Sequence, residues 1–110
     1  MAGKVLCIGD IILDSYCHGE VRRISPEAPI PVLKINTNKY EVLGGSGNVA
    51  RNICASGSIC HVITVSGDDE ESKVLRRLLN QTKKLSFDLI IDKERCTTKK
   101  TRFIGLSIKS

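Results

Sequence analysis

Hydrophobic residues follow two different spacings along the chain. Short apolar runs at residues 4–8, 59–65 and 87–91 are rich in β-branched residues and have the length of buried strands. Between them, apolar residues recur every three or four positions, as on one face of an amphipathic helix. The recurring residues are Val49, Ala50, Ile53 and Cys54 in one segment and Val74, Leu75, Leu78 and Leu79 in the next. The pattern predicts strands that alternate with helices.

Glycines and polar residues mark the ends of both predicted helices. The run Gly44-Gly45-Ser46-Gly47 precedes the first helix, and Gly57 is placed to end it. Residues 66–69 (Ser-Gly-Asp-Asp) precede the second helix, which begins with acidic residues and carries Arg76 and Arg77 in its later turns. This order of charges is favourable for the helix dipole.

Residues 16–43 have a different character. Pro26, Pro29 and Pro31 keep the backbone extended, and residues 30–35 can form a partly exposed strand. We therefore expect a β excursion away from the main sheet, and a further strand at 97–108. A PxxP ligand is an alternative interpretation of residues 26–29, although isolated matches are common. The order β, β excursion, α, β, α, β, β predicts an α/β sandwich with a parallel sheet.

The predicted sandwich is incomplete. The 110 residues suffice for one domain or for part of a larger one, and 41% hydrophobic with 26% charged residues is the composition of a folded protein. Two helices cover a sheet of three or four strands on too few sides. We therefore expect exposed sheet surface and poor solubility.

The cysteines and the N-terminal residues indicate a reducing compartment. The five cysteines include no CxxC pair, and the two histidines lack a zinc-type spacing. Reduced thiols are therefore expected rather than disulfides or a metal site. The apolar run at 4–8 is too short for a secretory or membrane-spanning segment. These observations predict a cytoplasmic protein without a membrane partner.

Basic residues are concentrated near the end of the chain, whose net charge is +5. Such a cluster can contact nucleic acid, but it contains one Phe and no aromatic pattern of an RNA-binding module. On a strand, Lys100 and Arg102 share one face and can jointly contact a phosphate. We rank a solvated strand face first, an anionic small-molecule substrate second and nucleic acid third.

The glycine run with Asn48 is the most informative candidate for binding. Glycines at a helix N-terminus let backbone N–H groups approach a ligand, and Asn48 can donate to and accept from hydroxyls. A tight turn that only requires glycine is the simpler alternative.

The same residues also match a dinucleotide fingerprint. Gly45-Ser-Gly47-Asn-Val-Ala50 fits GxGxxA, and Asp68 lies near the position of a ribose-binding acid. The context argues against this interpretation, because the fingerprint should directly follow the first buried strand. Residues 39–43, which precede it here, are poor material for a central strand.

Two carboxylates follow the first predicted strand. Asp10 and Asp14 come after its carboxyl end, where open α/β sheets bind ligands, and an Asp there can accept hydrogen bonds from two sugar hydroxyls. For Asp10 alone, a loop acid or helix cap is the simpler interpretation. No GxxxxGK[ST] segment is present, which excludes a P-loop.

Together these segments resemble the ribokinase-like (phosphofructokinase-B type) carbohydrate kinases. Within that family they are most similar to the kinase part of the bacterial enzymes that phosphorylate heptose 7-phosphate in ADP-heptose and lipopolysaccharide synthesis. The resemblance covers nearly all of residues 4–105, and the segment at 23–29 is its most specific part. The matching segments are 9–16 (GDIILDSY), 23–32 (RISPEAPIPV), 44–52 (GGSGNVARN), 67–69 (GDD) and 97–102 (TTKKTR).

The resemblance implies an incomplete ribokinase-like (Rossmann-type) sandwich, with residues 1–110 as the N-terminal fragment of a carbohydrate kinase domain. Residues 16–43 and 96–108 would form a β lid over the sugar. The family reaction transfers the γ-phosphoryl group of ATP, with Mg²⁺, to a sugar hydroxyl. The implied substrate residues are Asp14, Gly44, Gly45 and Asn48 for the hydroxyls, and Lys100 and Arg102 near the phosphate.

The family's catalytic Asp lies in a Gly-Ala-Gly-Asp type segment, which these 110 residues do not contain. We therefore expect no catalytic residue and no ligand of ATP or Mg²⁺ here, and no activity of the chain alone. The expected partners are a sugar phosphate and a separately encoded C-terminal kinase half, or a second copy bound through the lid. A non-catalytic sugar-binding or interaction module and, less favoured, a dinucleotide-binding domain are the alternatives.

Overall fold

The chain divides into two compact units. The computed structural model describes the backbone of residues 3–24 and 31–107, and the side chains of residues 3–18 and 39–105. The first unit comprises Met1–Asp14 and Val42–Lys100, and the second comprises Ser15–Glu41 and Thr101–Ser110. The PxxP segment and most of the motif at 23–29 lie outside the described residues.

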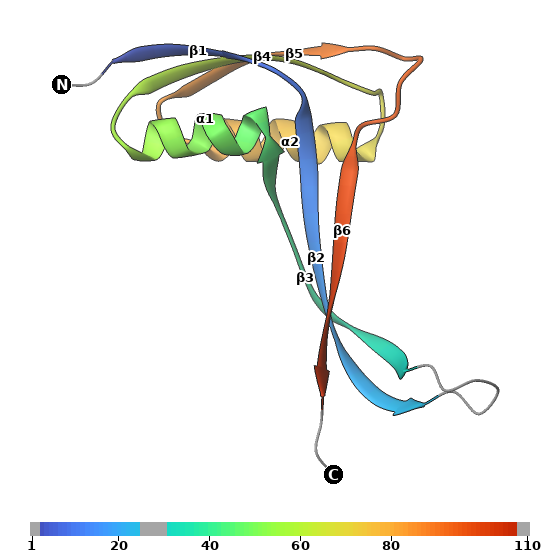
Figure 1. Cartoon of the computed structure of the whole chain (residues 1–110). Helices are drawn as coiled ribbons and strands as arrows, with labels where there is room; N and C mark the ends of the chain where they lie inside the picture. Colours follow the sequence, from blue (N-terminus) through green and yellow to red (C-terminus); the bar gives the residue numbers. More distant parts are fainter. Residues whose placement is uncertain (1–2, 25–30, 108–110) are drawn as a thin grey trace. The chain divides into compact units, whose positions relative to one another are not determined.

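A parallel sheet forms the centre of the first unit (Figure 1). Its strands are β1 (Lys4–Ile8), β4 (Ile59–Ser66) and β5 (Leu85–Ile91), in the order β1-β4-β5. Both pairings are parallel, and Leu6, His61 and Ser86 lie opposite one another across the three strands. The prediction of a parallel sheet from the three apolar runs is confirmed.

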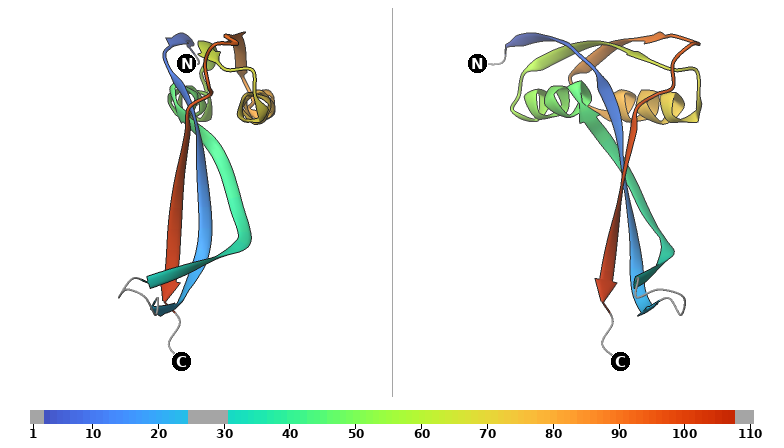
Figure 2. Two further views of the ribbon diagram at one scale, coloured as in Figure 1. Left: turned by 90° about the vertical axis from the view of Figure 1, so that its right-hand side faces the viewer. Right: turned by 45° about the vertical axis from the view of Figure 1, so that its right-hand side comes forward.

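Both helices of this unit, α1 (Ser46–Ala55) and α2 (Glu70–Gln81), lie on the same face of the sheet (Figures 1 and 2). This arrangement has a topological cause. The chain moves from β1 to β4 and then from β4 to β5 in one direction across the sheet. Because connections between parallel strands are right-handed, two steps in one direction place both connecting helices on one side.

The core lies between this face and the two helices. Ala50 and Cys54 of α1 pack with Cys60 and Val62 of β4, while Leu75 and Leu79 of α2 belong to a cluster with Leu89. Apolar side chains every three or four residues thus meet alternate residues of the strands, as the sequence predicts. Neither α1 nor α2, the helices of the described residues, is long and apolar enough to cross a membrane.

Three cysteines contribute to this core as small apolar residues. Cys54 and Cys60 are buried, Cys7 is half-buried, and all are free thiols. Burial, and to a smaller extent the neighbouring thiols of Cys54 and Cys7, raises the pKa of the Cys60 thiol. A raised pKa disfavours the thiolate, so Cys60 is chemically inert in the folded chain.

A second sheet has the strand order β3-β2-β6, formed by β2 (Ile11–Ile24), β3 (Pro31–Gly45) and β6 (Lys99–Ser107). The rings of Tyr16 and Tyr40 stack with their centroids 4.8 Å apart. The expected β excursion and the strand expected at 97–108 are present, with residue 108 outside the described range.

The strand β2 starts before residue 16, where the sequence analysis begins the β excursion. The strand begins at Ile11, because Ile11 and Leu13 are buried and alternate with the half-buried Ile12 and Asp14. This alternation over four residues is a strand pattern that the two carboxylates obscured. Ile11 and Leu13 pack in the same cluster as Leu43.

Asp69 connects the start of α2 to the segment before β6. As the N-cap of α2, its Oδ1 accepts a hydrogen bond from the Ser72 N–H at 2.9 Å. Thr97 donates to the same carboxylate twice, from its hydroxyl to Oδ1 at 2.6 Å and from its N–H to Oδ2 at 2.8 Å. The Thr97 hydroxyl in turn accepts from the Gly67 N–H at 3.0 Å. One carboxylate thus fixes the segment that leads into β6.

The ionised form of Asp69 stabilises this arrangement. Burial alone would raise its pKa, but the hydrogen bonds from Thr97 and Ser72 outweigh burial and lower the pKa below the usual value of 3.8. A carboxyl group whose pKa is lower in the folded state stabilises the fold fully when the pH is above its pKa in the unfolded chain. This stabilisation is lost as the pH falls through its pKa in the folded chain.

We therefore predict that Asp69→Asn destabilises the chain by about 1–2 kcal/mol at pH 7, because an amide cannot accept both Thr97 hydrogen bonds and the cap together. Urea unfolding at pH 7 and at pH 3 measures the effect. The difference between wild type and variant should shrink at the lower pH, where the Asp69 carboxylate begins to be protonated. Asp68→Asn changes the exposed neighbouring residue and is the matched control. It should change the free energy of unfolding by no more than about 0.5 kcal/mol at either pH.

Candidate functional site

The Asp14 carboxylate lies directly against the backbone of Gly44. Asp14 is on β2 and Gly44 is near the end of β3, and Gly44 is buried. A Cβ placed on Gly44 would lie 2.8 Å from Cγ of Asp14 and 3.1 Å from its Oδ1. A side chain at position 44 would therefore displace the Asp14 carboxylate from this place, so glycine permits the close approach.

Gly45 gives the chain the sharp turn from β3 into α1. Its φ of 57° and ψ of −132° lie in a region that residues with a side chain rarely adopt. A Cβ at this position would also collide with the backbone oxygen of Asp10. That oxygen accepts a hydrogen bond from the Ser46 N–H at 2.8 Å, and the Ser46 hydroxyl donates to the Gly9 oxygen at 3.2 Å. The glycine run is therefore tied to the loop that follows β1.

Asn48 lies in the first turn of α1 and is half-buried. Its Oδ1 accepts a hydrogen bond from Nη2 of Arg51, one turn further along the helix, at 2.9 Å. The amide NH₂ of Asn48 can donate to a ligand hydroxyl, and its oxygen keeps a second lone pair that can accept. The first turn of α1 contains no acidic residue, so its N–H groups keep the positive end of the helix dipole.

The segment that leads to Lys100 runs beside β2 next to Asp14, because the Leu13 N–H donates to the Thr98 oxygen at 2.9 Å. Lys100 is exposed and belongs to the first unit. Arg102, also exposed, follows on the same strand β6 but belongs to the second unit. The structure thus places Asp14, Gly44, Gly45, Asn48 and Lys100 in one unit.

Asp10 and Asp14 have separate surroundings, although the sequence suggested them as a pair. Asp10 lines a small polar cavity of about 60 Å³ at the carboxyl ends of β1 and β4. This cavity could not be predicted from the sequence, because most of its walls come from segments far from Asp10; the remaining lining residues are Ile11, Val65, Ser66, Arg95, Cys96, Thr97 and Thr98.

The topology contradicts the dinucleotide interpretation of the glycine run. A dinucleotide fingerprint connects a strand of the parallel sheet to the next helix. Here the strand before the glycines is β3, which pairs with β2 in the second sheet, while β1 pairs with β4.

No group of three His, Cys, Asp or Glu residues within the described ranges lies close enough to hold a metal ion. The Asp14 carboxylate is an oxygen acceptor, which suits the hydroxyl groups of a ligand.

Comparison with known proteins agrees with this geometry. No protein-family model matches the chain. The bifunctional protein HldE of Nitrobacter winogradskyi is 45% identical over 101 residues, which are 92% of this chain and 20% of that protein. HldE of Caulobacter sp. is 44% identical over the same length, again 92% of this chain and 20% of the relative.

Solved structures show the same fold. A carbohydrate kinase from Agrobacterium tumefaciens superposes with a TM-score of 0.71 at 22% identity, over 96% of this chain and 32% of that one. Phosphofructokinase-2 from Escherichia coli, in complex with substrates and products, gives a TM-score of 0.68 at 23% identity, over 94% of this chain and 31% of its own.

The chain therefore spans 20% of the length of the curated relatives and about a third of the solved kinases. It is a homologue of part of the bacterial HldE proteins and has the ribokinase-like fold of the carbohydrate kinases.

Proposed function

We propose that this chain is the sugar-binding portion of a heptose 7-phosphate kinase, which works in the synthesis of ADP-heptose for lipopolysaccharide. The observation that carries the proposal is the Asp14 carboxylate held against the buried Gly44, directly before the N-terminus of α1. Homology to part of the HldE proteins supports the heptose phosphate as the substrate class.

Each proposed contact follows from the chemistry of the residue. The Asp14 carboxylate accepts hydrogen bonds from two neighbouring sugar hydroxyls, and the Asn48 amide donates to a third. Gly44 and Gly45 leave the backbone N–H groups accessible to sugar oxygens. Lys100 and Arg102, two positions apart on β6, supply positive charge for the phosphate.

The phosphoryl transfer itself requires groups that we assign to the regions of the relatives that these 110 residues do not match. ATP and Mg²⁺ would bind there, together with the catalytic Asp, because the described residues provide neither a metal-ligand cluster nor a glycine-rich anion site with an Asp behind it. This chain would bind and orient the acceptor sugar but would be inactive alone.

Thermal unfolding of the purified chain with D-glycero-β-D-manno-heptose 7-phosphate tests the proposal. At a ligand concentration a hundred times the dissociation constant, binding to the folded state adds about 2.7 kcal/mol of stability. We expect a cooperative transition whose midpoint rises with the sugar phosphate. A cooperative transition that does not move at any concentration up to 10 mM would contradict sugar binding.

Asp14→Asn and Gly44→Ala are expected to remove most of this thermal shift. In Asp14→Asn, one carboxylate oxygen is replaced by an NH₂ group, which cannot accept a hydrogen bond from a hydroxyl. In Gly44→Ala, the added methyl group displaces the Asp14 carboxylate. The loss of a charge-assisted hydrogen bond corresponds to an affinity about 10- to 100-fold lower, measurable by isothermal titration calorimetry. Asp88→Asn, on an exposed residue of β5, is the matched control and should bind like the wild type.

Lys100→Ala and Arg102→Ala are expected to act on the phosphate alone. Each variant should bind heptose 7-phosphate about tenfold more weakly, while the affinity for the unphosphorylated heptose stays unchanged, because only the phosphate carries charge. Calorimetric titration with both sugars separates the two effects. Equal weakening for both sugars would assign these residues to the hydroxyls or to the fold.

A further inference from the structure

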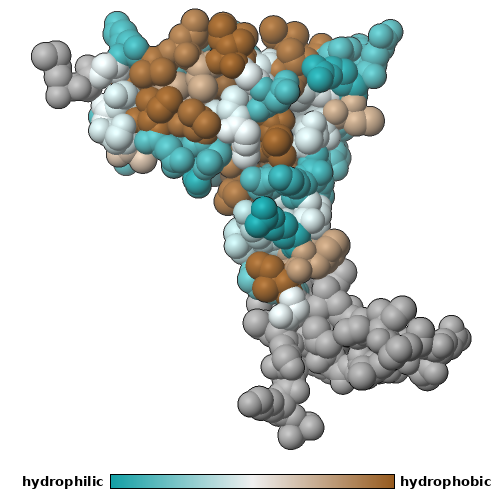
Figure 3. Space-filling view, viewed as in Figure 1, coloured by the Kyte–Doolittle hydropathy of each residue, from teal (hydrophilic) through white to brown (hydrophobic). Residues whose placement is uncertain are grey.

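Three free cysteines of the first unit lie together between α1 and the parallel sheet. Cys7 comes from β1, Cys54 from the last turn of α1 and Cys60 from the start of β4. Cys54 and Cys60 belong to one core cluster, and Cys7 packs against it. The exposed hydrophobic side chains gather elsewhere, along the upper side of the first unit in Figure 3. The thiols are thus enclosed by the chain's own helix and strands.

Cys54 and Cys60 meet at one backbone oxygen. The Cys54 thiol donates to the Lys84 oxygen at 3.4 Å, and the Cys60 N–H donates to the same oxygen at 3.0 Å. The Cys60 side chain points from β4 towards α1, because it packs with Ala50 and Cys54. The two cysteines are six positions apart in the sequence, on either side of the turn at Gly57. A disulfide between them would join the end of α1 to the start of β4.

Cys7 also neighbours Cys60 but is less suited to a disulfide. In the parallel register Cys7 lies opposite Val62, whereas the residue opposite Cys60 is Val5. Residues in such diagonal positions have Cα atoms about 7–8 Å apart, and a disulfide needs about 4.4–6.8 Å. The Cys7 thiol lies instead 4.0 Å from the Ser46 oxygen, at the other end of α1. The three cysteines do not form a group that could hold a metal ion.

Cys54 is the member of the pair that a reagent from solvent reaches. It lines an open pocket of about 350 Å³, whose other walls are Arg51, Ala55, Thr82, Lys83 and Lys84. Three of these wall residues are cationic at neutral pH, so an anion that leaves the Cys54 sulfur is stabilised there. The pocket thus gives a small oxidant access to one sulfur of the pair.

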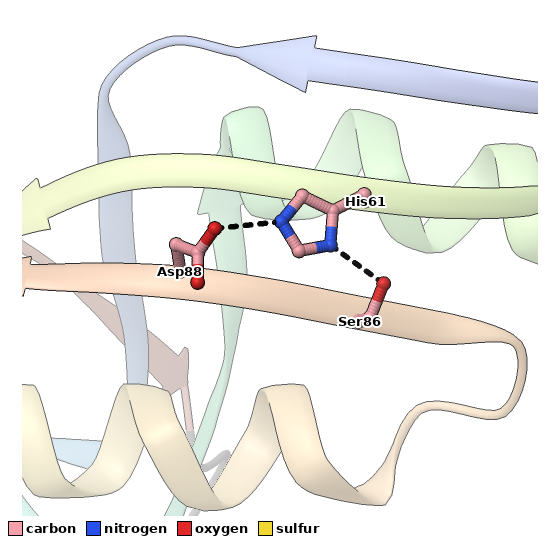
Figure 4. A network of polar contacts seen from close by, with 3 residues as sticks. All are labelled: His61, Ser86 and Asp88. Atoms are coloured by element: carbon pink, nitrogen blue, oxygen red, sulfur yellow. Dashed lines mark hydrogen bonds and ion pairs between the residues drawn. The ribbon is translucent and has the colours of Figure 1, made fainter.

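Cys60 is inert towards reagents in solvent. It has no exposed surface, and burial raises the pKa of its thiol. Its neighbour His61 supplies no base, because alternate residues of a strand point to opposite faces of the sheet. The His61 ring lies 2.6 Å from the Ser86 hydroxyl through Nδ1 and 2.9 Å from Oδ2 of Asp88 through Nε2 (Figure 4). Cys60 therefore reacts only with a group that has already formed beside it.

We propose that Cys54 and Cys60 form a reversible disulfide when the protein meets hydrogen peroxide. The Cys54 sulfur attacks one peroxide oxygen, the O–O bond breaks, and the leaving hydroxide takes the thiol proton to become water. The Cys60 sulfur then attacks the sulfenic acid on Cys54, the S–O bond breaks, and the leaving hydroxide takes the Cys60 proton. The two thiols lose two electrons in total, and the peroxide is reduced to two water molecules.

The disulfide fixes the junction between α1 and β4. A crosslink restricts the unfolded chain, so the oxidised protein is more stable than the reduced protein. A dithiol reductant restores both thiols by exchange. The modification is separate from the proposed sugar site, because Asn48 and the glycine run lie at the opposite end of α1. The pair thus acts as a redox-sensitive clamp on the core of the first unit.

Peptide mapping of the full chain after treatment with hydrogen peroxide tests the disulfide. Trypsin cleaves after Arg51 and Lys73, so Cys54 and Cys60 remain together on the peptide 52–73. We expect this peptide to lose two hydrogen atoms in mass, and both of its thiols to resist alkylation in urea until dithiothreitol is added. Oxidation should also raise the midpoint of urea unfolding, and dithiothreitol should reverse the shift.

Cys7→Ala is the matched control, because it removes the other thiol beside Cys60. It should leave the oxidation of the peptide 52–73 unchanged. Cys54→Ala and Cys60→Ala should each abolish the mass loss and the shift in urea, with circular dichroism verifying that both are folded. In Cys60→Ala, the reaction should stop at a sulfenic acid on Cys54, which dimedone traps.

Two results would overturn the proposal. One is a folded wild-type chain in which Cys54 and Cys60 are still fully alkylated in urea after peroxide treatment. The other is a crosslink between the peptides 5–22 and 52–73, which would assign the disulfide to Cys7 or Cys17 instead. Neither result bears on the thermal shift with heptose 7-phosphate, so the sugar site is tested separately.

Discussion

The handedness of the connections between parallel strands determines most of this structure. Two right-handed steps in the same direction, from β1 to β4 and from β4 to β5, bring both helices to one face of the sheet. Burial on that face accounts for the core. On the other face the described residues contribute no helix, and Leu6, Ile8, Ile59 and Ile90 are exposed.

The same constraint places the candidate sugar site. The step from β1 to β4 contains the excursion through β2 and β3, so the chain returns to the carboxyl end of β1 before it enters α1. Gly44 meets Asp14 at this return, and Ser46 is fixed to the oxygens of Gly9 and Asp10. At the start of α2, Asp69 holds Thr97 and thereby the segment that leads into β6. Two carboxylates thus position segments that are far apart in the sequence.

The sequence predicted the regular elements and part of the site. The parallel strands and the helices were predicted from the spacing of apolar residues and from the Gly and Asp residues at helix ends. Both patterns involve residues that are close together in the sequence. The start of β2 at Ile11 was not predicted, because Asp10 and Asp14 obscured a short alternation. The close approach of Gly44 to Asp14 and the His61, Ser86 and Asp88 network depend on pairing between strands. The spacing of residues along the chain contains no information about the register between strands. The resemblance to sugar kinases supplied part of this missing information.

The register of the parallel sheet also orders the events of folding. β4 pairs with β5 through the short connection that contains α2, so these elements can form from one continuous segment. β1 is different, since Lys4 lies opposite Ile59, and the two come from different halves of the chain. Closing so long a loop is entropically costly and slow. The pairing of β1 with β4 therefore closes a longer loop, at a higher entropic cost, than the pairing of β4 with β5.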